Sequence, residues 1–322
     1  MLNASTRRDH ATPGSPRSRK WRASPLLILT VLAAVAGVTT LTYSPAASWI
    51  SLLNQNQVVS RYEESINDVQ PSAEEQLLAA HAYNAALSSG ALLAANANVP
   101  QGSGQMAGSA LDYLKMLSTP TGVMSRIQIP KIAVDLPVYH GTSEETLEQG
   151  VGHLEGTSLP VGGPSTHAVL TAHRGLPSAT LFTDLNLVEV GDTFTITTLG
   201  EVLSYRVIKT AVVAPDETET LRQVEGADLV TLVTCTPLGV NSHRILVTGE
   251  RVTPTPPKAL AEAAAPPENA GFPWWAVAYL ASLIAIGCYA WWGGKPPRQR
   301  EPRSGRSMVE PSGPTADRSC EG

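Results

Sequence analysis

The sequence predicts a mainly β domain that is carried between two membrane-spanning helices. From about residue 123 to residue 251, short apolar runs alternate with turn residues, as in a closed barrel or a sandwich. Two uncharged segments of membrane length, 25–43 and 272–292, flank this region, and a helical pattern follows the first of them. The β region spans about 130 residues, which is enough for one independent core.

The first apolar segment, residues 25–43, has nearly the ~20 residues that cross a bilayer. Only Asp9 offsets the basic residues before it, which are Arg7, Arg8, Arg17, Arg19, Lys20 and Arg22. We therefore expect residues 1–24 to form a cytoplasmic basic tail. A cleaved signal peptide is the alternative, but the run is long for one, and residues 43–47 match a small-x-small cleavage site poorly. We favour an uncleaved transmembrane signal-anchor.

The second apolar segment, residues 272–292, carries tryptophans at both ends, where aromatic belts lie in membrane helices. The basic residues Lys295, Arg298, Arg300, Arg303 and Arg306 follow it closely. Residues 293–322 are thus predicted to be a disordered cytoplasmic tail, and residues 44–271 to be extracellular. This outer part has 11 basic and 23 acidic residues, a balance of −12, whereas the whole chain has a net charge of −5. Such acidity argues against a nucleic acid partner and fits a basic or lysine-presenting one, although solubility alone also explains it.

Residues 44–112 are expected to be an extracellular helical segment. Ser72 and Glu75 form a capping box at the start of a helix that Gly90 can close. Residues 96–109 are small, polar and glycine-containing, which predicts a mobile loop. After the β region, residues 253–271 read as a Pro/Ala linker that lifts the domain from the second anchor.

Seven β-strands and one short helix are predicted within the β region. The helix covers residues 143–149, with Thr142 as its cap and Glu145 as the capping-box partner. The predicted strands are 125–129, 134–139, 167–172, 193–198, 202–214, 229–235 and 244–251.

Cys235 is the only cysteine between the two apolar segments, so it has no partner within its own domain. A lone thiol in an oxidising compartment is a liability unless its reactivity is used, although an inert buried cysteine is the alternative. His173 ends another predicted strand and Arg244 opens the last one. A nearby imidazolium or guanidinium stabilises a thiolate, and an arginine can also bind an oxyanion in acyl transfer.

The remaining polar residues do not by themselves define a site. His140, His153, His167 and His243 also lie near predicted turns, and such histidines are more often structural than catalytic. No acidic pair demands glycosidase or aspartic-protease chemistry, and no Cys/His spacing indicates zinc. The glycines near Val161 precede no phosphate-loop lysine and read as a turn.

A set of motifs in order along residues 113–252 resembles the class C, or pilin-polymerising, sortases. The stretches are IQIPKI (127–132), LPVYHGT (136–142), GVGHLEGTSLP (150–160), HAVLTAHRGLP (167–177), LFTDL (181–185), TLVTCTP (231–237) and NSHR (241–244). The helical segment and the two-anchor topology resemble that class as well. The resemblance implies an eight-stranded sortase-type β-barrel over residues 113–252.

The resemblance assigns Cys235 as the nucleophile, His173 as the catalytic histidine and Arg244 as the third catalytic residue. It implies that Cys235 cleaves an LPXTG-type sorting signal between Thr and Gly, and that a lysine amine of another pilin subunit resolves the thioacyl enzyme. The implied partners are pilins and other surface proteins with such signals, at a Gram-positive cell membrane. No metal or organic cofactor is implied.

The chain departs from the class C pattern at the lid, which usually carries an Asp-Pro-aromatic motif. Residues 96–104 offer only Asn98-Val99-Pro100, so any lid there is expected to lack the usual aspartate and aromatic anchor. Three alternatives stay open. A sortase that anchors proteins to peptidoglycan would share every catalytic residue. A papain-type hydrolase would place its cysteine before its histidine, opposite to the order here. A tethered binding module would need no catalysis at all.

Overall fold

The computed structural model describes residues 21, 23–88, 113–217, 219–267 and 269–295. The chain forms two units. One contains the residues up to Ala36 and from Ser282 onward, with the first part of helix α1 (Pro25–Ser65) and the last part of helix α5 (Trp274–Gly293). The other, Gly37–Ala281, contains the β-barrel. Both α1 and α5 are long and apolar enough to cross a membrane.

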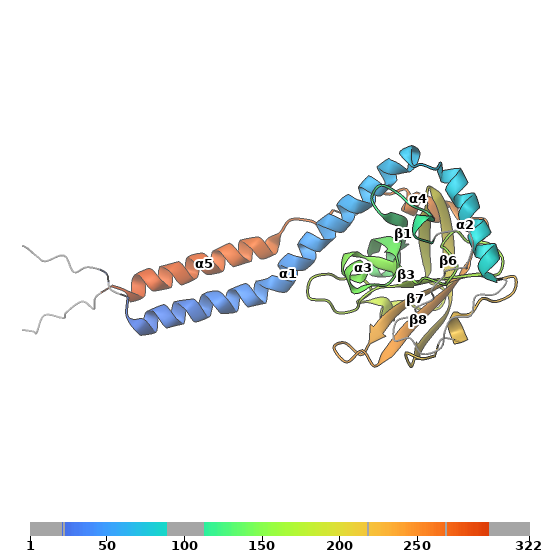
Figure 1. The fold of residues 1–322 in the computed structure, drawn as a ribbon. Coiled ribbons are helices and arrows are strands. Elements are labelled where there is room, and N and C mark those ends of the chain that lie inside the picture. Colours follow the sequence, from blue (N-terminus) through green and yellow to red (C-terminus); the bar gives the residue numbers. More distant parts are fainter. Residues whose placement is uncertain (1–20, 22, 89–112, 218, 268, 296–322) are drawn as a thin grey trace, which may run out of the picture. The chain divides into compact units, whose positions relative to one another are not determined.

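Eight strands close into a barrel in the order β1-β2-β3-β4-β7-β8-β6-β5 (Figure 1). Their bounds are β1 (Val123–Ile129), β2 (Val134–His140), β3 (Val151–His153), β4 (Thr166–Thr171), β5 (Thr193–Thr198), β6 (Glu201–Val213), β7 (Asp228–Thr236) and β8 (His243–Arg251). The seven predicted strands are confirmed to within two residues at each end. The eighth, β3, was not predicted from its own residues, because three residues with a central glycine show no alternation.

One end of the barrel gathers the last residues of β4 and β7 and the first residues of β2 and β8. Strands β4 and β7 run parallel, and β7 pairs antiparallel with β8, so the last residues of β4 and β7 lie beside the first residues of β8. Strand β3 is antiparallel to β4 and parallel to β2, which places the start of β2 and the β1–β2 hairpin at the same end. We call this end the catalytic rim.

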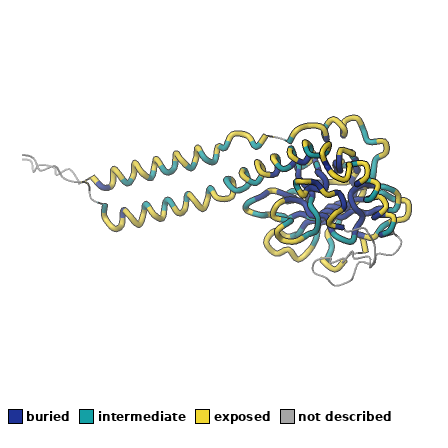
Figure 2. Tube along the Cα trace, turned by 45° about the horizontal axis from the view of Figure 1, so that its top comes forward, coloured by how far each residue is buried: buried dark blue, intermediate teal, exposed yellow. Residues whose placement is uncertain are grey.

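The barrel encloses one apolar core, and a smaller cluster packs on its outer face. On β7 and β8, the core takes Val230, Leu232, Ile245 and Val247. The alternate residues point outward, and Val169, Val233 and Leu246 form the outer cluster with Leu154 and Leu221. Figure 2 shows that buried residues concentrate in the barrel. Because strand side chains alternate between faces, this division fixes the direction of every residue near the rim.

Helix α1 continues well beyond the predicted span 25–43 and ends at Ser65. Its later turns pack on the barrel, where Val59 and Tyr62 are fully buried. The Tyr62 hydroxyl accepts a hydrogen bond from the amide of Leu199 at 2.8 Å and donates to the carbonyl of Met124 at 3.2 Å. The extension therefore connects the first apolar segment to the barrel.

Helix α2 (Ala73–Ser88) begins with the predicted capping box. The amide of Glu75 donates to Ser72 Oγ at 3.3 Å, and the amide of Ser72 donates to Glu75 Oε2 at 3.0 Å. The predicted stop at Gly90 and the loop 96–109 lie outside the described residues.

The predicted cap of the short helix is wrong by one residue. Helix α3 is Glu144–Gln149, and its cap is Ser143, whose hydroxyl accepts from the amide of Thr146 at 3.2 Å. Serine is the residue before the first helical turn, so its side chain reaches that turn, whereas Thr142 lies one position too early.

A buried arginine holds the segment after the barrel against the strands. Arg126 on β1 is 1% exposed and forms ion pairs with Glu63 of α1 and Asp135 of β2. Its remaining donors bind the carbonyls of Ala263 and Ala265, each at 3.0 Å. The first of these ends helix α4 (Pro257–Ala263), so part of the region predicted as a linker is helical and packed on the barrel.

Candidate active site

His173, Cys235 and Arg244 come together on the outer face of three neighbouring strands at the catalytic rim. Cys235 on β7 pairs directly with Arg244 on β8. The parallel register of β4 with β7 pairs Thr171 with Val233, so two residues further on His173 lies beside Cys235. Val233 and Leu246 point outward, so by alternation Cys235 and Arg244, two residues away on the same strands, also point outward. Val169 points outward as well, and the same alternation continued past the end of β4 directs His173 outward. The sheet therefore presents all three side chains to the same side.

The backbone beneath this site is well supported. The amide of Ala172 donates to the carbonyl of Val233 at 3.2 Å, and Thr234 Oγ1 donates to the carbonyl of Ala172 at 2.8 Å. Thr234 is fully buried, so the residues next to His173 and Cys235 are tied across the two strands on the inner side. Cys235 itself is half-buried, and its thiol is free.

Glu144 lies against His173, at 3.3 Å between Oε1 and Nε2. This is an ion-pair distance, but the alignment does not make a hydrogen bond, and Nε2 is otherwise buried without a partner among the described residues. Glu144 is 76% exposed, so the contact is screened by water. No residue spacing predicts this contact, because Glu144 of α3 and His173 after β4 lie on separate elements 29 positions apart.

Arg174 connects the loop after β4 to the end of β7. Its guanidinium donates to the carbonyl of Thr183 at 2.9 Å, to Thr236 Oγ1 at 2.9 Å and to Asn186 Oδ1 at 2.7 Å. Thr236 follows Cys235, so Arg174 fixes the loop beside the nucleophile. Arg174 belongs to the motif at residues 167–177, but neither its residue type nor its spacing indicated this role.

Arg244 is partly held by its own loop. Its Nη1 donates to the carbonyls of Asn241 at 2.9 Å and His243 at 3.1 Å, and these are its only hydrogen bonds among the described residues. The rest of the guanidinium fork is then available to a carbonyl oxygen or an oxyanion next to Cys235. His243 is exposed, and its Nδ1 lies 2.9 Å from Ser242 Oγ. It is not one of the candidate catalytic residues.

Three other histidines are structural. His153 is completely buried, and its Nε2 donates to the carbonyl of Ser158 at 2.8 Å while Nδ1 accepts from the Tyr113 hydroxyl at 2.9 Å. Burial lowers the pKa of His153 to about 4. Burial also lowers the pKa of His140, which contacts the Met116 carbonyl, and of His167. All three are therefore neutral at pH 7 and committed to the barrel.

A thiol, an imidazole and a guanidinium on one face of a barrel rim define a candidate cysteine acyl-transfer site. Residues 127–252 match the model of the sortase domain. The chain is 32% identical over 137 residues to sortase D of Bacillus subtilis strain 168, and 30% identical over 130 residues to sortase A of Bacillus anthracis. The matched region spans 66% of sortase D and 60% of sortase A. It corresponds to 41% and 40% of this chain, respectively.

Solved structures agree with the sequence match. Sortase C1 of GBS pilus island 1 is 42% identical with a TM-score of 0.55, over 62% of this chain and 93% of that one. Sortase C-1 of Actinomyces oris is 51% identical with a TM-score of 0.50, over 56% and 97%. The chain belongs to the sortase family, whose members are cysteine transpeptidases, and class C sortases are among its structural neighbours.

Proposed function

We propose that this protein is a membrane-anchored cysteine transpeptidase that joins pilin subunits. The observation that carries the proposal is the placement of Cys235, His173 and Arg244 on one outer face of β7, β4 and β8. The similarity to sortase C1 of a pilus island and to other class C sortases supports the choice of pilin as substrate.

In the proposed reaction, the Cys235 thiolate attacks the threonine carbonyl carbon of an LPXTG-type sorting signal. Arg244 hydrogen-bonds the oxygen as it becomes an oxyanion. The Thr–Gly C–N bond breaks, His173 as imidazolium gives its proton to the leaving glycine amine, and a thioester remains on Cys235. A lysine amine of the next pilin then attacks the thioester, His173 takes the proton, and the thiolate leaves.

The proposed location is the cell membrane, with the barrel outside and both termini in the cytoplasm. Helices α1 and α5 have the required length and composition, and the basic residues that flank the two apolar segments support this orientation. In the barrel unit, Trp49 of α1 and Trp275 of α5 pack edge to face with centroids 6.2 Å apart. These rings suit the interfacial layer of a bilayer. The proposed divisions of the chain are those given from the sequence, with helix α4 inside residues 253–271 and with α1 extending past residue 43 to Ser65.

The experiment uses the full chain in detergent with the peptide LPETG and one of two acceptors. Product analysis by mass spectrometry should show cleavage between Thr and Gly and transfer to the side-chain amine of Nα-acetyl-lysine amide. Transfer to an oligoglycine or stem-peptide amine in preference to the lysine would instead support a wall-anchoring sortase. Absence of cleavage by the wild-type chain, with hydroxylamine present as a strong nucleophile, would refute the transpeptidase proposal.

A further inference from the structure

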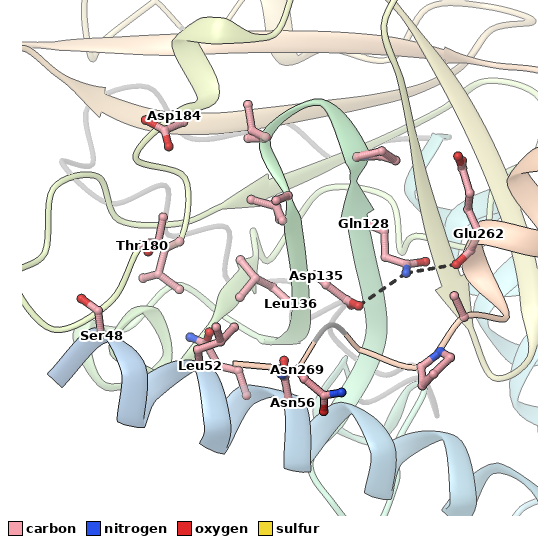
Figure 3. A pocket seen from close by; sticks show the side chains of 18 of the residues that line it. Ser48, Leu52, Asn56, Gln128, Asp135, Leu136, Thr180, Asp184, Glu262 and Asn269 are labelled. Atoms are coloured by element: carbon pink, nitrogen blue, oxygen red, sulfur yellow. Dashed lines mark hydrogen bonds between the residues drawn. The ribbon is translucent and has the colours of Figure 1, made fainter. Parts of the chain in front are cut away.

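A pocket of about 700 Å³ opens at the end of the barrel that carries the β1–β2 hairpin. Its walls come from α1, the β1–β2 hairpin, the loop after β4 and the segment after α4 (Figure 3). The apolar part of the lining includes Trp49 and Leu52 of α1, Ile132 of the hairpin and Leu181 of the loop. None of the three candidate catalytic residues lines this pocket.

The loop after β4 connects the pocket to the nucleophile. Thr180, Leu181 and Asp184 of this loop line the pocket. In the same stretch, the amide of Phe182 donates to the carbonyl of His173 at 3.1 Å. The carbonyl of Thr183 accepts from Arg174, whose guanidinium also holds Thr236, the residue after Cys235. One short stretch thus forms a wall of the pocket and touches the neighbours of the candidate catalytic residues.

The pocket favours a cation. Its described lining contains the acidic residues Asp135, Asp184 and Glu262 and no lysine or arginine. Asp135 is neutralised by Arg126, and Glu262 lies 3.6 Å from Lys258. Asp184 is half-buried, and its carboxylate has no hydrogen bond or ion pair within the described ranges. It is therefore the carboxylate of the described pocket lining that no cation pairs with, and the apolar lining next to it suits a methylene chain.

We propose that this pocket binds the lysine-bearing segment of the acceptor, with Asp184 attracting the lysine ammonium, which gives one proton to solvent before the free amine attacks the thioester on Cys235. This site rests on the proposed transpeptidase function and assigns its second substrate to a surface separate from the face where the sorting signal meets Cys235. The acceptor approaches from the α1 side of the rim, and Asp184 is a specificity residue for an amine carried on a long apolar stem.

The test is a competition between two nucleophiles for one thioacyl enzyme. The full chain in detergent receives the peptide LPETG together with hydroxylamine and Nα-acetyl-lysine amide, and the ratio of lysine product to hydroxamate is measured. Hydroxylamine is neutral and too small to need the pocket. Because both products come from the same intermediate, the ratio is independent of the amount of folded enzyme and of the rate of thioacyl formation.

We expect Asp184→Asn to lower this ratio by about tenfold or more, as for loss of a hydrogen bond to a charged group. Asp184→Lys should lower it further, and Asp184→Glu should restore part of it. Glu189→Gln is the matched control, since it removes one exposed charge on the same connection but outside the pocket. Its ratio should stay within twofold of wild type.

A ratio for Asp184→Asn within twofold of wild type would overturn the site. An equal fall for Glu189→Gln would also overturn it, because the effect would then come from the general charge of the surface. Wild-type enzyme that forms hydroxamate but no lysine product would contradict the lysine pocket while leaving the acyl-transfer chemistry intact. Failure to form either product would refute the proposed function, and this site with it.

Discussion

Acid should destabilise the barrel through His153, and the size of the effect follows from its surroundings. The imidazole is fully buried and has a pKa of about 4, whereas an unfolded chain gives histidine a pKa near 6.5. Between these two pKa values the unfolded state binds more protons than the folded state. The contribution of His153 to the unfolding free energy is therefore fully present above about pH 6.5 and is lost as the pH falls toward 4. The loss attributable to this histidine is about 2 kcal/mol at pH 5 and about 3 kcal/mol at pH 4.

The comparison that isolates this contribution is His153→Gln against wild type. A glutamine can still accept from the Tyr113 hydroxyl and donate to the carbonyl of Ser158, but it cannot take up a proton. His140 and His167 add acid sensitivity to both proteins, and Asp228, whose pKa burial raises, acts in the opposite direction in both. The contributions of His167 and Asp228 cancel in the difference, whereas His140, which pairs with His153 across β2 and β3 and lowers its pKa, is coupled to the substitution.

The assay is thermal unfolding at pH 7.5 and pH 5, followed by the tyrosine near-UV circular dichroism of the full chain in detergent. The difference of about 2 kcal/mol corresponds to roughly 4–8 °C in the pH-induced shift of Tm for a domain of this size. His243→Gln, which alters an exposed histidine, should leave the wild-type shift unchanged. Equal shifts in wild type and His153→Gln would refute the assignment of acid sensitivity to His153.

Three further predictions concern single residues. Arg126→Met leaves Glu63 and Asp135 without their cation and should lower the unfolding free energy by about 3 kcal/mol in the same thermal assay. The control is Arg222, which forms an exposed ion pair. Arg222→Met should lower the unfolding free energy by less than about 1 kcal/mol. If Arg126→Met lowered the unfolding free energy no more than Arg222→Met, the stabilising role of the buried Arg126 ion pairs would be contradicted. Gly175 has a φ of +74°, and a Cβ there would overlap the side chain of Leu238. Gly175→Ala should therefore lower Tm and peptide cleavage together. A fully active variant would show that the loops carrying Gly175 and Leu238 separate readily. Arg244→Lys should lower kcat/KM for the peptide about 10²- to 10³-fold with Tm unchanged, and a fall below threefold would remove Arg244 from oxyanion binding.

Seven of the strands were predictable from sequence because they alternate or form buried runs of clear length. These patterns left a closed barrel and a sandwich open, and the eight-stranded barrel was predicted only through the resemblance to sortases. Strand β3 is too short to show that pattern and is defined only by its partners in β2 and β4. The extension of α1 had a weak signal, since Val59 and Tyr62 are spaced as on one helix face, but the polar residues around them hid it.

The candidate site also contains residues that the sequence revealed and residues that it did not. Cys235 stood out because it lacked a partner cysteine, but nothing in residue spacing separated His173 from the other histidines without the family motifs. The structure supplies a physical distinction, because His153 is buried and doubly hydrogen-bonded whereas His173 faces outward beside Cys235. The contacts of Glu144, Arg174 and Arg126 join segments far apart in the chain, so no local pattern could reveal them. The region in which a lid was considered, residues 96–104, lies outside the described residues.

The most direct test of the central claim is the intact mass of the full chain after incubation with the peptide LPETG and rapid acid quenching. We predict a mass increase equal to the peptide acyl group up to threonine, located on Cys235 by fragmentation, reversed by hydroxylamine and absent in Cys235→Ala. An adduct that persists in Cys235→Ala, or one located on Cys288 instead, would contradict the assignment of Cys235 as the nucleophile.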